Sequence, residues 1–193
     1  YIMHYSARDP KDGRLKIGVA KATSPLGPFI DVYDQQPMFD LGYAVIDGHV
    51  FIDEDQKKYF YFARDCSEYV YEGRHESHLY VSMISEDLLS LKGDIMKVLQ
   101  PSQPWEFKSG ERRWNEGPFL LKHEGLYYLM YSSNFYASKE YAIGYATSKS
   151  PLGPFIKAEE NPVLSYVDQV ISGPGHNSVV KTEKGELLCV YHV

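Results

Sequence analysis

Asp47, Glu116 and His176 are the residues of this sequence whose types could carry out chemistry together, and each is flanked by a glycine. A pair of carboxyl groups can cleave a glycosidic bond, because one donates a proton to the leaving oxygen while an ionised one activates water or attacks the sugar. A neighbouring negative charge or an apolar wall would raise the pKa of the donor toward neutrality. Acyl or phosphoryl transfer would call for a nucleophile elbow, a phosphate loop or a zinc-ligand pair, and the sequence shows none at motif spacing.

An internal repeat indicates how these residues could meet. Residues 17–30 recur as residues 143–156, at an offset of 126 (143 − 17), and both copies contain Ser-Pro-Leu-Gly-Pro-Phe-Ile. A second pattern, in which two short apolar runs flank a charged turn, occurs three times and is typical of β-hairpins. These hairpins span residues 50–62, 119–131 and 179–191.

The repeats predict an all-β fold, a β-propeller. Its unit is a hairpin plus at least one outer strand, and it recurs every 60 to 70 residues or so without an intervening amphipathic helix. A β-sandwich is the alternative, but a sandwich would not need the same aromatic position to recur in successive units. That position is filled by Tyr5, Phe62, Tyr131 and Tyr191.

We expect the chain to cover about three blades. The predicted parts are the remainder of a first blade (1–40), a second blade (41–100), a third (101–165) and the start of a fourth (166–193). Because such a ring cannot close, we expect residues beyond both ends to complete it.

The repeat register predicts that the three candidate residues converge. Glu116 lies 69 residues after Asp47 (116 − 47), and His176 lies 60 after Glu116 (176 − 116), which are the offsets that relate the hairpins. In a propeller the innermost strands line a central channel, so equivalent positions on them face one another. Taken singly, each residue also has an ordinary structural interpretation. Asp47 could be a turn aspartate, Glu116 an exposed acid and His176 a histidine bonded to loop backbone.

Several motifs together resemble glycoside hydrolase family 43, and the resemblance covers nearly all of the chain. They lie at residues 46–51, 104–106, 115–119, 122, 125, 127–132 and 173–178 and in both Ser-Pro-Leu-Gly-Pro-Phe copies. The resemblance implies a five-bladed propeller and an inverting mechanism. It implies that Glu116 is the general acid, that Asp47 raises the pKa of Glu116 and orients it, and that His176 lies at the floor of the pocket. A metal ion or water in the channel is implied near His176; calcium would be its usual, structural ion, and no cofactor is required.

The general base is the part of this mechanism that the 193 residues do not supply. The resemblance calls for an aspartate on the inner strand of the first blade, and the register places it at position −10 (116 − 126), before Tyr1. Asp9 follows the second strand of its hairpin, so it is interpreted as a turn residue. The hypothesis is therefore an acid upstream of Tyr1, which the full gene sequence would test.

The substrate side is expected to come from two long connections. Residues 63–78 and 94–115 are rich in aromatic and arginine side chains, and long loops on a rigid scaffold often carry specificity. The predicted substrate-binding residues are His176, Trp114, Arg64 and Ser133.

Charge and hydropathy exclude several partners. The net charge is −6 with both signs scattered, which disfavours nucleic acid and anionic membranes. No stretch approaches the roughly 20 apolar residues of a membrane span. The resemblance favours an extracellular or periplasmic location, where polymers are degraded.

The predicted activity is exo-acting hydrolysis that releases α-L-arabinofuranose or β-D-xylose from arabinose- or xylose-containing plant cell-wall polysaccharides. An endo-arabinanase of the same fold is one alternative. A glycan-binding propeller without catalysis is another.

Overall fold

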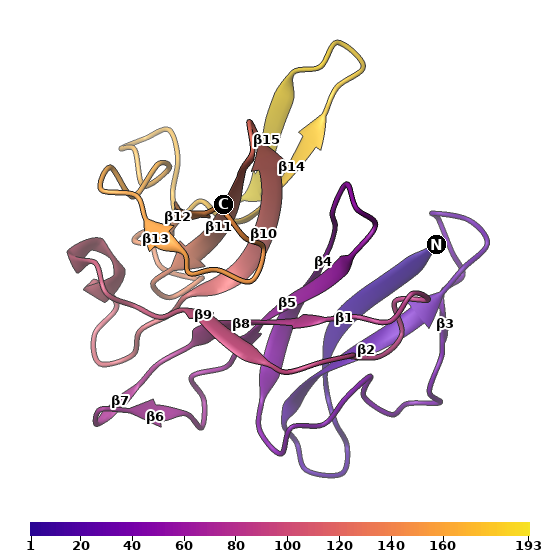
Figure 1. Ribbon diagram of the computed structural model, residues 1–193. Helices are drawn as coiled ribbons and strands as arrows, with labels where there is room; N and C mark the ends of the chain where they lie inside the picture. The colour runs from indigo at the N-terminus through magenta and orange to yellow at the C-terminus, as the bar shows by residue number, and fades with distance from the viewer.

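The structure, a computed structural model, describes residues 1–193 and consists of four successive antiparallel sheets (Figure 1). The first sheet contains β1 (Ile2–Arg8), β2 (Leu15–Lys21) and β3 (Ile30–Asp31). The second contains β4 (Val45–Ile52), β5 (Lys58–Arg64), β8 (His78–Met83) and β9 (Met96–Leu99). The third contains β10 (Glu116–His123), β11 (Leu126–Ser133), β12 (Ala142–Ser148) and β13 (Ile156–Lys157), and the fourth contains β14 (Gly175–Lys181) and β15 (Leu187–His192).

Two small elements lie in the connections. A hairpin of β6 (Val70–Tyr71) and β7 (Arg74–His75) separates β5 from β8, and the short 3-10 helix η1 (Pro104–Phe107) precedes β10. None of the helical segments has the length and apolar character that a membrane crossing requires.

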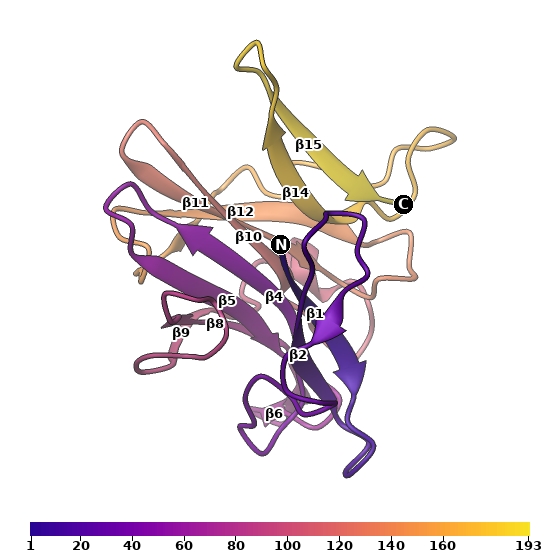
Figure 2. The same ribbon diagram turned by 90° about the vertical axis from the view of Figure 1, so that its right-hand side faces the viewer.

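The sheets follow one another around a common axis, as propeller blades do. Strand β4 contacts β1 on one side and β10 on the other, and β10 contacts β14 in turn. Figure 2 shows the first and fourth sheets at the two ends of this series. The polypeptide therefore repeats one supersecondary unit whose inner strands are neighbours.

Strand β5 carries four consecutive aromatic residues, Tyr59 to Phe62, and is buried on both faces. Successive side chains of a strand point to opposite sides. Tyr59 and Tyr61 accordingly pack between the second and third sheets, whereas Phe60 and Phe62 pack between the first and second. A strand enclosed in this way needs a continuous apolar run rather than an alternating one.

One part of the predicted register is wrong by one residue. Ile52 pairs with Lys58 in the second sheet, and the equivalent pair in the third sheet is Lys122–Tyr127, so the third sheet has one residue fewer between equivalent pairs. The second strands keep the offset of 69 (132 − 63), but the first strands differ by 70 (116 − 46). Asp47 and His176 are thus equivalent, while Glu116 lies one position earlier on its strand.

Core truncation should show how strongly the interface between the second and third sheets holds the fold. Leu129 is fully buried there, so Leu129→Ala should lower the free energy of unfolding by about 2–5 kcal/mol through lost burial and the cavity left behind. Denaturant unfolding of the full natural chain measures this. The control is Leu26→Ala, because Leu26 is 95% exposed and its loss should change stability by less than about 0.5 kcal/mol.

Candidate active site

A cavity of about 710 Å³ receives side chains from all four sheets. Arg8 ends β1, and the lining of the cavity includes Asp47 from β4, Glu116 from β10 and His176 from β14. The three residues singled out in the sequence therefore meet in one place, despite the one-residue difference in register.

A backbone irregularity at the start of each inner strand explains this meeting. The ladders of β4, β10 and β14 all shift register at this point, and β-bulges re-aim side chains next to binding sites. The bulge residues Asp47, Gly117 and His176 have φ values of 61°, 57° and 46°. Asp47 and His176 carry side chains that make a positive φ cost more free energy than it does for glycine. Their neighbours must therefore hold them in this conformation.

The Asp47 carboxylate connects the second sheet to the residue that follows Glu116. Its Oδ2 accepts a hydrogen bond of 3.0 Å from the Gly117 amide, and its own amide donates to Ser6 Oγ at 3.1 Å. The two carboxyl groups are thereby fixed in neighbouring positions by main-chain contacts.

Glu116 is the group that keeps a proton. It is 7% exposed, and burial raises the pKa of its carboxyl well above the ordinary value. The negative charge of Asp47 raises this pKa further, whereas the hydrogen bond of 2.9 Å that Tyr141 donates to Oε1 opposes the shift. A buried carboxylic acid whose pKa is raised in this way is suited to donating its proton.

Asp47 is the member of the pair with more contacts that stabilise its ionised form. Burial raises the pKa of Asp47 as well, but the charge of His176 and the Gly117 amide both oppose the shift. Because two neighbouring carboxyl groups do not readily ionise together, these surroundings favour the charge on Asp47 and the proton on Glu116.

Tyr141 is a site residue that sequence reasoning missed. A Cβ at position 175 would lie 1.9 Å from the Tyr141 ring, so Gly175 leaves the space through which Tyr141 reaches Glu116. Among seventeen tyrosines nothing distinguishes this one. The glycine in front of His176 is the only indirect signal.

The other sequence candidates separate into two groups. Trp114 lines the cavity, with its ring 5.8 Å from that of Phe135. Arg64 does not line it, because its guanidinium is held between the rings of Tyr43 and Tyr69 at 4.1 and 3.7 Å. Ser133 also lies outside the lining, because it is fully buried and its hydroxyl donates to the Trp114 carbonyl.

Two features of the cavity wall had no signal in the repeat. Phe135 and Tyr136, just after β11, line it and are 43% and 63% exposed. At the rim, Arg14 Nε donates to both carboxylate oxygens of Glu68, at 3.0 and 2.8 Å, and so spans from the first sheet to the second.

The donors around His176 do not by themselves fit calcium. Calcium takes six to eight oxygen ligands, whereas His176 offers a ring nitrogen and has another imidazole, His192, as a neighbour at 6.5 Å between centroids. No three His, Cys, Asp or Glu side chains gather as a metal site. A channel ion stays a prediction, and no step of the chemistry below depends on it.

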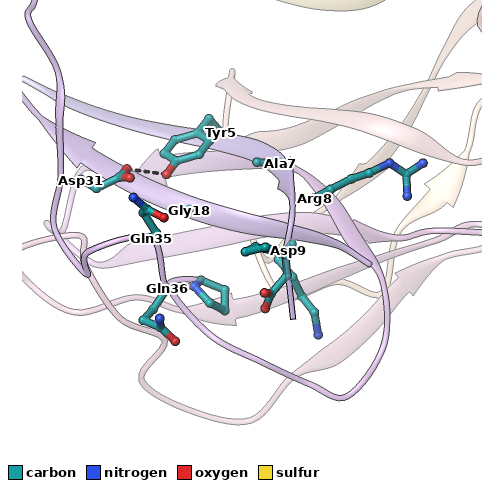
Figure 3. Close-up of a pocket in the computed structure, with 11 residues that line it drawn as sticks. Tyr5, Ala7, Arg8, Asp9, Gly18, Asp31, Gln35 and Gln36 are labelled. Carbon is teal, nitrogen blue, oxygen red and sulfur yellow. Dashed lines mark hydrogen bonds between the residues drawn. The ribbon is translucent and has the colours of Figure 1, made fainter. Parts of the chain in front are cut away.

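A second cavity, of about 240 Å³, lies beside β1 and β2 (Figure 3). It includes Tyr5, whose hydroxyl donates to Asp31, and Asp9. The Asp9 amide and carbonyl bond to Arg14 and Gly13, so Asp9 closes the turn after β1, as the sequence predicted. The larger cavity is therefore the one that unites the paired acids.

The fold and this cavity define a β-propeller with two neighbouring carboxyl groups in its channel, and the surroundings of Glu116 favour the protonated form that the acid in glycosidic bond cleavage must have. The chain matches the glycosyl hydrolases family 43 over residues 1–193 and belongs to that family. It is 54% identical to a thermostable family-43 glycoside hydrolase of known structure, with a TM-score of 0.93 over 99% of this chain and 61% of the other.

Two curated relatives match over the whole chain. The chain is 32% identical to a β-D-galactofuranosidase of Aspergillus niger and 27% identical to a xylosidase/arabinosidase of Bacteroides ovatus. It spans 50% and 60% of their respective lengths. The structures of this family are five-bladed propellers, so the predicted fold is confirmed, with this chain forming part of the ring.

Opposite substitutions around Glu116 should move its titration in opposite directions. Asp47→Asn removes a negative charge and should lower the pKa of Glu116. Tyr141→Phe removes a donor to the carboxylate and should raise it. Carbon-13 NMR titration of the Glu116 carboxyl in the full natural chain measures both. Tyr136→Phe is the control and should leave the titration unchanged; shifts of one sign in both test variants would contradict the assignment.

Proposed function

We propose that this chain is part of an inverting glycoside hydrolase that releases arabinofuranose or xylose from plant cell-wall glycans. The observation that carries the proposal is the meeting of two carboxyl groups, Glu116 and Asp47, in one cavity, where burial and the neighbouring charge raise the pKa of Glu116. The names of the relatives support the sugar class, since one is a xylosidase/arabinosidase and another acts on a furanoside.

In the proposed reaction Glu116 donates its proton to the glycosidic oxygen as the bond to the anomeric carbon breaks. Water attacks that carbon from the opposite face and gives its own proton to a base, which the proposal assigns to an aspartate upstream of Tyr1. The sugar leaves with inverted configuration, and solvent returns a proton to Glu116. Asp47 keeps the acid protonated between turnovers by holding a negative charge beside it.

The cavity wall supports a sugar ligand that enters by its end. Trp114, Phe135 and Tyr136 supply aromatic faces, on which sugar rings can pack. The ion pair of Arg14 and Glu68 closes part of the rim, which favours a pocket and release of a terminal sugar over an open groove and internal cleavage.

Replacing the acid should separate substrates by leaving group. Glu116→Gln should lower kcat/KM by about 10²–10⁴-fold on oligosaccharides, whose leaving group needs protonation. Activated aryl glycosides leave without that help and should lose much less. Steady-state kinetics on both classes test this, with Glu124→Gln as the control because the Glu124 side chain is 84% exposed. Equal losses on the two classes would remove the acid role.

The products should report the mechanism and the mode of cleavage. Proton NMR of the first-formed sugar should show the inverted anomer, because a directly attacking water reverses the configuration. Chromatography of digests of linear arabinan should show a single sugar from the start. Early oligosaccharides would instead indicate the endo-acting alternative.

A further inference from the structure

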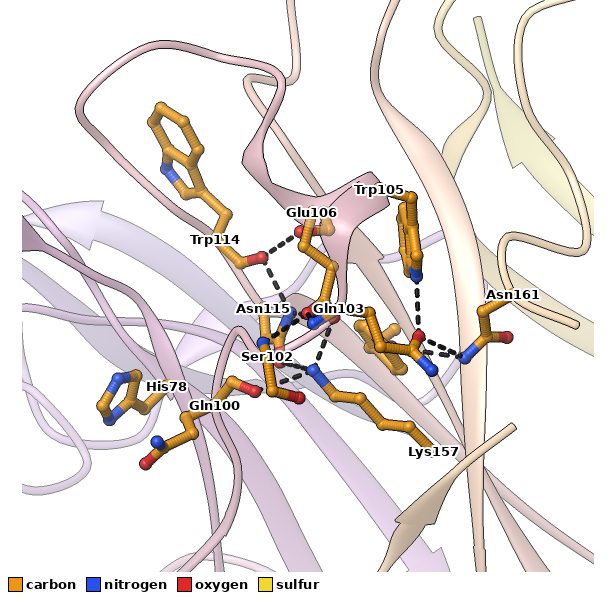
Figure 4. A network of polar contacts seen from close by, with 12 residues as sticks. His78, Gln100, Ser102, Gln103, Trp105, Glu106, Trp114, Asn115, Lys157 and Asn161 are labelled. Atoms are coloured by element: carbon orange, nitrogen blue, oxygen red, sulfur yellow. Dashed lines mark hydrogen bonds and ion pairs between the residues drawn. The ribbon is translucent and has the colours of Figure 1, made fainter. Parts of the chain in front are cut away.

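A buried network of polar side chains surrounds Asn115, the residue that precedes Glu116 (Figure 4). Lys157, on the outermost strand β13, donates its three ammonium protons to Glu106, to Asn115 Oδ1 at 2.9 Å and to the Gln100 carbonyl at 2.7 Å. The side chain of Lys157 is 8% exposed and that of Glu106 is fully buried. The network thus runs from β13, the outermost strand of the third sheet, to Asn115, the residue that precedes Glu116.

Every polar side-chain atom of Lys157, Glu106 and Asn115 has at least one hydrogen-bond partner. Glu106 Oε2 accepts the amides of Ser102 and Gln103, and Oε1 accepts Lys157 and Asn115 Nδ2, the latter at 3.0 Å. The second amide proton of Asn115 goes to the Trp114 carbonyl at 2.8 Å. A network in which every such atom has a partner permits one arrangement, because any shift leaves a buried group without a partner.

The network is not a requirement of the blade. Lys157 pairs with Ala146 across the sheet, and in the first sheet the equivalent Ala20 pairs with Asp31. Asp31 is exposed and binds Tyr5 instead. A buried ion pair is in general weak evidence of stabilisation, since well-packed apolar residues often serve as well. The buried network is therefore a feature of the third sheet, which carries Glu116, and is not shared by the first sheet.

We propose that Lys157 and Glu106 are positioning residues, which fix Asn115 and through it the direction in which Glu116 presents its proton. This inference rests on the proposed function. Trp114, on the other side of Asn115, lines the cavity, so the same network also sets the aromatic wall. Burial lowers the pKa of Lys157 to about 8 against the pull of Glu106, which agrees with a lysine held where solvent cannot hydrate it.

The test compares leaving groups in variants of the full natural chain. Lys157→Met should lower kcat/KM on oligosaccharides by about 10- to 100-fold, because a misplaced acid transfers its proton poorly. On activated aryl glycosides the loss should stay within a few-fold. A structural role alone would lower both by the same factor, as fewer molecules would be folded.

Two further variants keep the result decisive. Lys157→Met leaves Glu106 as an unpaired buried charge and can destabilise the fold, so the double variant Lys157→Met with Glu106→Gln removes both charges and should show the same selective loss. The control is Lys122→Met, which breaks the ion pair with Asp53 at the opposite end of β10 and should change both substrate classes equally.

The outcomes distinguish the positioning role of Lys157 and Glu106 from the hydrolase function on which it rests. If Glu116→Gln shows the selective loss while both Lys157 variants lose activity equally on the two classes, or lose none, the positioning role is overturned and the hydrolase remains. If Glu116→Gln itself shows no selectivity, the acid role and the positioning role are both overturned.

Discussion

One hydrogen bond holds the site together, that from the Gly117 amide to the carboxylate of Asp47. It joins the second sheet to the third at the residue next to Glu116, and it needs the left-handed backbone that both bulge residues adopt. It also keeps a negative charge beside a buried acid. Two carboxyl groups in such a place share a proton unequally, and the contacts of Asp47 decide which of them holds it.

The faces of the sheets and their inner ends have different roles. Between the sheets, aromatic and aliphatic side chains such as those of β5 fill the core and supply the hydrophobic stabilisation. At the inner ends, polar groups are buried, and each must find a partner. Tyr141 is such a partner for Glu116, and Lys157 is one for Asn115, so hydrogen bonds contribute to the rigidity of the site.

The repeat made the sheets and the convergence of the three residues predictable, because strands of one blade must present equivalent positions to the same channel. It could not reveal the hairpin turn that is shorter by one residue, since Asp47 and Glu116 remained aligned by type. At the offset of 126, Tyr141 and Phe135 correspond to Leu15 and Asp9 (141 − 126 and 135 − 126), so the repeat gave no sign of either aromatic side chain. Arg64 was expected to face the cavity, but the strand direction and two flanking tyrosine rings turn it elsewhere.

The cavity is lined by residues from four separate sheets, so it forms only when these sheets have assembled. No hairpin made early on the ribosome contains a working centre, because the acid, its ionised neighbour and the channel histidine reside in units that are synthesised one after another. Competence arrives only when the units have docked. Local opening of any single inner strand would also disperse the centre, because each of these strands carries a different member of it.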